Sequence, residues 1–140
     1  MSNNVWQQLF SSNGITVWTE AMKAYFEWFS NAHKTLDEAR KMGFVEYQKA
    51  FDDDAEYGFQ KMLKQLENLP TPNTKDCKNI IKDLKQAIKC QINFRRSDLE
   101  LVNDPSSRAK AGNTGFWLTS SNELYKSAYG KFKNKFEVNQ

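Results

Sequence analysis

Residues 74–92 read TKDCKNIIKDLKQAIKCQI and decide the fold class of the chain. The apolar positions of this stretch are Cys77, Ile80, Ile81, Leu84, Ala87, Ile88 and Ile92. They recur every three or four residues, and lysines occupy the opposite side. Thr74, or Asn73 before it, can cap the first turn, and Asp76 lies where the helix dipole favours a negative charge. The stretch therefore predicts an amphipathic helix with one buried face.

Helical periodicity extends through most of the remaining chain. After a short lead over residues 1–15, apolar spacing predicts helices over residues 16–33 and 35–51 and again over 57–69. The acidic run at 52–54 is expected to interrupt the second of these, and Pro70 and Pro72 are expected to turn the chain. A flexible, basic loop over 104–112 precedes a last helix that begins near Asn113 or Thr114. We predict one all-α domain over residues 1–140, a four-helix bundle of the up-down type.

The composition favours packing over chemistry. The 140 residues suit one domain, and 20 basic against 17 acidic residues leave a formal charge of only +3. Ten Phe, five Tyr and four Trp are a heavy aromatic load for a chain of this size, which indicates self-association. Cys77 and Cys90 lie about 20 Å apart along one predicted helix, too far for a disulfide, so we expect reduced thiols.

Motifs for catalysis or metal binding are not apparent in the sequence. His33 is the one histidine, and on an aromatic-rich helix we expect it to pack or cap, not to act as a base. Neither a Cys/His ligand set nor a glycine-rich phosphate loop occurs. We therefore expect a protein that is not an enzyme and that uses no metal, cofactor or small-molecule substrate. The N-terminus has no signal-peptide pattern, and no apolar run is long enough for a membrane helix.

Two adjacent arginines, Arg95 and Arg96, stand at the predicted C-terminal end of the long helix, next to Phe94. Two interpretations are open from spacing alone. The arginines can bind phosphate through their forked donors, or they can complement the helix dipole and cap its last carbonyl groups. The lysines on the preceding face are more typical of a solvated surface than of a binding track.

Three segments together resemble the coat proteins of rod-shaped plant viruses, namely tobamoviruses, tobraviruses and hordeiviruses. The first runs from VWTE at 17–20 to KTLDEAR at 34–40 and resembles a Trp-containing helix that leads into an Ala-Arg pair. The second, FRR at 94–96 continuing to VN at 102–103, resembles the arginine-rich end of that family's third helix. The third comprises LTS at 118–120, NE at 122–123 and KSAY at 126–129, followed by Phe132 and Phe136.

The resemblance implies a subunit of a helical rod that encloses genomic single-stranded RNA, found in the virion and the host cytoplasm. By position it assigns Arg40, Arg95 and Arg96 to RNA phosphates, and Asn113, Thr114 and Phe116 to the bases. It also makes Asp52, Asp53, Asp54 and Glu100 candidates for carboxylates that repel each other between subunits, and a solvated turn is the alternative interpretation of these acids. The aromatics Trp6, Phe10, Phe132 and Phe136 are expected to contact neighbouring subunits.

The chain departs from the family pattern in two places. It is shorter than most members between residue 103 and the final aromatic pattern, and Asn113-Thr114-Gly115 replaces the acidic residues that open the tobamovirus fourth helix. Two alternatives also account for an aromatic helical chain without catalytic motifs. One is a helical adaptor that binds a single protein partner, and the other is an amphipathic coat on a lipid or polymer granule. Neither alternative needs RNA.

Overall fold

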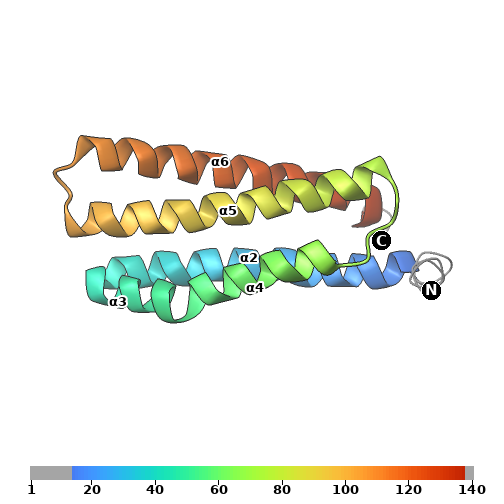
Figure 1. Ribbon diagram of the computed structural model, residues 1–140, viewed down its shortest axis with the longest axis horizontal. Coiled ribbons are helices and arrows are strands. Elements are labelled where there is room, and N and C mark those ends of the chain that lie inside the picture. Colours follow the sequence, from blue (N-terminus) through green and yellow to red (C-terminus); the bar gives the residue numbers. More distant parts are fainter. Residues whose placement is uncertain (1–13, 138–140) are drawn as a thin grey trace.

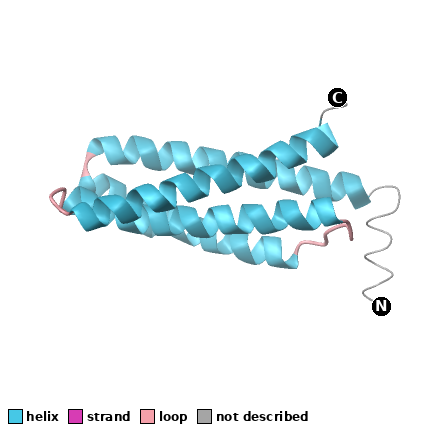
Figure 2. Cartoon of the chain, turned by 90° about the horizontal axis from the view of Figure 1, so that it is seen from above, coloured by secondary structure: helices cyan, strands magenta, loops and turns pink. Residues whose placement is uncertain are grey.

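A computed structural model describes residues 14–137 of the chain. Within that range all regular structure is helical and no strand occurs. The elements, in order, are α2 (Gly14–Met42), α3 (Phe44–Lys49), the π-helical turn η1 (Ala50–Ala55), α4 (Glu56–Asn68), α5 (Lys75–Asn103), α6 (Arg108–Phe132) and a second π-helical turn, η2 (Lys133–Glu137). The four long helices lie side by side along one axis (Figures 1 and 2). The prediction of an all-α bundle is therefore confirmed.

The first half of the bundle differs from the sequence prediction in where the chain breaks. Residues 16–33 and 35–42 belong to one continuous 29-residue helix, α2, because neither Lys34 nor Thr35 interrupts a helical pattern. The break comes instead at Gly43, whose φ of +116° is a conformation that residues with a side chain rarely adopt. The acidic run at 52–54 does not end the helical segment either. It lies in the π-helical turn η1, which leads directly into α4.

The second half follows the predicted helices with shifted ends. Thr74 is the N-cap of α5, and its Oγ1 accepts a hydrogen bond from the Cys77 N–H at 3.2 Å. The helix continues to Asn103, so Arg95 and Arg96 lie within α5 and not at its end. The interpretation of these arginines as caps of the last carbonyl groups is therefore wrong.

The loop before the last helix is also shorter than predicted. Helix α6 begins at Arg108, five residues before Asn113, and the connection from α5 covers only residues 104–107. Ser107 explains the early start, because its Oγ accepts from the Lys110 N–H at 3.2 Å and thus caps the first turn. The alanines and basic residues that follow are good helix formers, so they extend the helix instead of the loop.

Aromatic side chains from α2 and α6 form much of the core. Phe26 contacts Tyr125, Tyr129 and Phe132 with ring centroids 5.2–5.8 Å apart. Phe132 is completely buried there, so it cannot contact a neighbouring subunit as expected. Phe136 is partly buried against Trp18, while Trp6 and Phe10 lie outside the described residues.

Both cysteines are in α5, and both are buried free thiols, as their spacing predicts.

Candidate nucleic-acid interface

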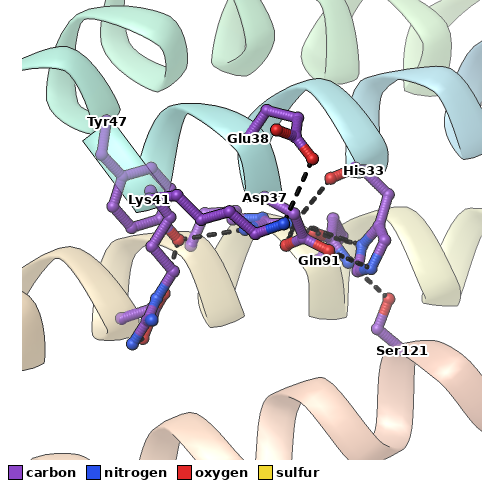
Figure 3. A network of polar contacts seen from close by, with 10 residues as sticks. His33, Asp37, Glu38, Lys41, Tyr47, Gln91 and Ser121 are labelled. Carbon is purple, nitrogen blue, oxygen red and sulfur yellow. Dashed lines mark hydrogen bonds and ion pairs between the residues drawn. The ribbon is translucent and has the colours of Figure 1, made fainter. Parts of the chain in front are cut away.

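Arg95 is the centre of a buried polar network between α2, α3 and α5. Figure 3 shows this network and labels its partners Asp37, Tyr47 and Gln91. Its exposed fraction is 0%, and each guanidinium nitrogen has a partner within the protein. Nε donates to Oε1 of Gln91 at 2.7 Å, Nη1 donates to the Tyr47 hydroxyl at 3.1 Å, and Nη2 donates to Oδ1 of Asp37 at 2.9 Å. Nη2 also donates to the backbone carbonyl of His33 at 3.2 Å. A phosphate cannot reach this side chain, so the assignment of Arg95 to RNA is corrected to a structural role.

Asp98 is the second buried charge of this region, and it binds Arg40. Arg40 Nε and Nη2 donate to the two carboxylate oxygens at 2.6 and 3.2 Å, and the Tyr47 hydroxyl donates to Oδ2 at 2.6 Å. The Asp98 side chain is 3% exposed, whereas that of Arg40 is 46% exposed. Arg40 therefore neutralises a buried carboxylate with one edge of its guanidinium and presents the rest to solvent.

Tyr47 connects the two arginine–carboxylate pairs. Its hydroxyl accepts from Arg95 and donates to Asp98, so the order of the contacts is Asp37, Arg95, Tyr47, Asp98 and Arg40. Burial raises the pKa of Tyr47 well above its ordinary value, so the hydroxyl keeps its proton at neutral pH. The hydrogen bond to Asp98 raises the pKa of Arg40. Two positive and two negative groups thus balance each other in this part of the bundle.

The network reaches α6 through Gln91. Its Nε2 donates to Oγ of Ser121 at 3.1 Å, and that hydroxyl donates to the backbone carbonyl of Ala87. His33 lies at the edge of the same network, with Nδ1 3.4 Å from Gln91 Oε1 and Nε2 3.3 Å from Oδ2 of Asp37. The sequence analysis missed Tyr47, Gln91, Asp98 and Ser121.

A signal for part of this network is present in the sequence. Gln91, Arg95 and Asp98 continue the three- and four-residue spacing of the apolar positions Leu84 and Ile88 along α5. Polar residues at core positions of a helix indicate buried partners on neighbouring helices. Which residues of α2 and α3 supply those partners depends on the tertiary structure.

The other residues assigned to RNA differ in their exposure. Arg96 is 54% exposed and forms an ion pair with Glu56 of α4. Asn113 and Phe116 are exposed near the start of α6. Thr114 is buried, donates to the Lys110 carbonyl at 2.7 Å and lies 2.9 Å from the Ser97 hydroxyl of α5. Thr114 therefore holds α6 against α5 and does not face a ligand, which corrects its assignment.

The predicted carboxylates remain exposed. Asp52, Asp53 and Asp54 lie together in η1, and Glu100 lies on α5. Within residues 14–137 none of the four forms an ion pair. Their side chains thus face solvent.

An aromatic surface with two open hollows lies between α2 and α4. Trp28 is 38% exposed and Tyr57 is 70% exposed. Hollows of about 500 and 290 Å³ are both lined by Trp28, Gly58 and Lys61. The indole of Trp28 occupies the position where a Cβ at residue 58 would lie, 2.5 Å from its nearest ring carbon, so glycine makes the close contact possible.

Comparisons with known proteins do not assign the chain to a family. No family model matches the sequence, and neither curated proteins nor solved structures yield a significant match. The resemblance to rod-shaped virus coat proteins therefore rests on the sequence motifs. In the part of the chain that the structure describes, no helix is long and apolar enough to cross a membrane. The same residues contain no group of three or more His, Cys, Asp or Glu side chains placed to hold a metal ion.

Proposed function

We propose that this protein is a structural coat subunit, an up-down four-helix bundle that assembles with copies of itself into a helical rod around single-stranded RNA. The observation that carries the proposal is the exposure of large apolar side chains on several parts of the surface. These are Val17, Trp28, Met42, Val45, Tyr57 and Phe116, which are between 38% and 72% exposed. A subunit of a polymer needs contact surfaces on more than one side, because each copy meets neighbours in different directions.

The exposed part of the predicted RNA site supports the nucleic-acid half of this proposal. Arg96 and the outer edge of Arg40 can contact phosphates, which gives affinity that does not depend on sequence. Phe116, at 61% exposure, and Asn113 offer an aromatic ring and an amide to the bases. Arg95 contributes indirectly, since its bond to Tyr47 fixes the hydroxyl that also holds Asp98.

The exposed carboxylates fit the same proposal as an assembly switch. In a rod, Asp52, Asp53 and Asp54 of one subunit would approach an acidic residue such as Glu100 of the next. Ionised carboxylates repel each other at short distance, so such contacts would weaken the rod. The virion and the host cytoplasm are the proposed locations.

Negative-stain electron microscopy of the full chain, with and without RNA between mildly acidic and neutral pH, tests this function. We expect rods or stacked discs, with rod lengths that follow the RNA length. Arg96→Ala is the suitable site variant, because its partner Glu56 is 28% exposed and can be rehydrated, whereas Arg95→Ala would disrupt the core. Small uniform particles under all conditions would refute the coat-subunit proposal.

The hollows beside Trp28 support a second candidate function, that of an adaptor that binds one protein partner. Two adjacent hollows with exposed aromatic walls are typical of a site for apolar side chains of another protein. An adaptor would sediment as a monomer or dimer at every concentration and pH, which distinguishes it from a polymerising subunit. A granule coat would instead bind apolar surfaces and gain helix content on binding.

A further inference from the structure

Basic side chains form a straight row along the solvent side of α5. Its members, named here the cationic row, are Lys75, Lys78, Lys82, Lys85, Lys89 and Arg96. Successive members are three, four, three, four and seven residues apart, the spacing that keeps side chains on one face of a helix. At 1.5 Å per residue the row is roughly 30 Å long, with a cation about every 5 Å over its first four steps.

Most of the row is free of internal ion pairs. Lys85 pairs weakly with Glu67 at 3.9 Å, and Arg96 pairs with Glu56, both from α4. Among residues 14–137, Lys75, Lys78, Lys82 and Lys89 have no carboxylate within ion-pair distance. Four ammonium groups are therefore available to an external anion.

Two acids of α5, Asp76 and Asp83, are held away from the row by basic residues of α6 and η2. Asp83 binds Lys131 at 2.9 Å and the Ser127 hydroxyl at 3.1 Å, and Asp76 binds Lys135 at 3.1 Å. These pairs direct both carboxylates toward α6 and η2 and neutralise them. Over residues 75–89 the charges of α5 are thus separated into a side whose acids are paired and a cationic side that is largely unpaired, whereas Glu100, one turn beyond Arg96, is an exposed acid.

The surface along the row is hollowed. An open depression of about 270 Å³ is lined by Lys78, Ile81, Lys82, Lys85, Gln86 and Lys89. Four ammonium groups and one amide around a shallow trough can hold several anionic groups in succession, while the amide can hydrogen-bond to oxygen or nitrogen acceptors. A single phosphate ion would use only part of it.

We propose that the cationic row binds the phosphate backbone of single-stranded RNA, so that the strand runs along α5 from Lys75 toward Arg96. This inference rests on the proposed coat function and adds to it the main path of the RNA on the subunit. A flexible single strand can follow a straight row, whereas each strand of a duplex winds away from it. An anionic membrane surface fits less well, because interfacial helices need a large apolar face beside the cations, and Ile81, partly buried, is the one apolar residue of the trough.

The test is RNA binding by the full chain with Lys78, Lys82 and Lys89 all replaced by Gln. Fluorescence anisotropy with a labelled oligouridine would be measured over a series of salt concentrations. The matched control carries Lys34→Gln, Lys49→Gln and Lys126→Gln, three exposed lysines outside the row that form no ion pair within residues 14–137, so the net charge changes equally. Each lost phosphate contact on a single strand lowers the salt slope by about 0.7, so the row variant should lose about two units of slope, and the control should not.

The possible results of these experiments test the RNA-binding role of the cationic row and the proposed coat function independently of each other. Parent-like RNA binding by the row variant, an equal loss in the control, or no binding by the parent would each overturn the row assignment. Equally tight binding to vesicles of anionic phospholipid, lost in the same variant, would overturn it in favour of a membrane. If the parent binds RNA through the row yet never forms rods, the inference stands and the coat function fails. If both the parent and the row variant form rods of RNA-determined length, the coat function stands and the inference fails.

A single substitution guards against misfolding of the triple variant. Lys82→Glu, compared with Lys49→Glu, reverses one charge inside or outside the trough. A larger loss of RNA affinity for Lys82→Glu supports the row, and equal losses overturn it. Circular dichroism checks that each variant keeps the helix content of the parent.

Discussion

Replacing Arg95 by Ala should destabilise the bundle far more than the same change at its neighbour Arg96. The Arg95 side chain is 0% exposed and donates to three other side chains, so its removal takes one buried donor from the Tyr47 hydroxyl and one from Oε1 of Gln91. Breaking a buried ion pair by removing one partner costs about 3–5 kcal/mol. The remaining carboxylate, Asp37, is 47% exposed and regains water, which places the expected cost near the lower end, about 3 kcal/mol.

Arg96→Ala is the control, and its effect should be small because the Arg96–Glu56 pair is exposed to solvent. Arg96 is 54% exposed and its partner Glu56 is 28% exposed, so loss of that pair should cost about 0–1 kcal/mol. A chain of this length loses roughly 3–4 °C in Tm per kcal/mol, so we expect Arg95→Ala to melt about 10 °C below the parent and Arg96→Ala within a few degrees of it.

Urea unfolding followed by circular dichroism at neutral pH measures the difference. Arg95→Met should fall between the two, because it fills most of the volume but makes no hydrogen bonds. If Arg95→Ala is no more destabilising than Arg96→Ala, the buried network does not hold the helices together, and the reasoning from burial is refuted.

Three further predictions follow from local geometry. Gly43→Ala should lower the free energy of unfolding by about 1–3 kcal/mol, because a residue with a side chain is strained at a φ of +116°. Gly115→Ala should raise the free energy of unfolding by about 0.5–1 kcal/mol, because the added Cβ meets open space in α6. Equal shifts of Tm for the two variants in thermal melts would contradict this prediction. Burial raises the pKa of Tyr125 to about 12, so the folded state keeps a proton that the unfolded state loses above about pH 10, and stability should fall between pH 10 and 12. In urea titrations over that range Tyr125→Phe, which also loses the 3.1 Å hydrogen bond to the Phe26 carbonyl, should show a shallower decline; an unchanged slope would exclude this contribution. Phe116→Gln should leave the unfolding free energy within about 0.5 kcal/mol of the parent but reduce rod formation in electron micrographs, and a large loss of stability would show that the exposed ring has a core role instead.

The helices and the buried face of α5 could be predicted because they depend on local pattern. The cap at Thr74, the stop at Pro70 and the apolar spacing of residues 77–92 each act within a few residues of themselves, and the structure has all three. The boundaries that the sequence analysis misplaced have equally local causes, since the turn at Gly43 and the cap at Ser107 each depend on a single residue.

For the candidate site, local pattern determines less and the tertiary structure determines more. The sequence by itself determined that α5 is amphipathic, with a cationic side and an apolar core side. It could not tell Arg95 from Arg96, which are adjacent in sequence and alike in chemistry. Only the tertiary structure decided that one is surrounded by α2 and α3 and the other faces solvent. The physical reason is that successive residues of a helix point about 100° apart, so the packing of the neighbouring helices, and not residue type, determines which charge is buried.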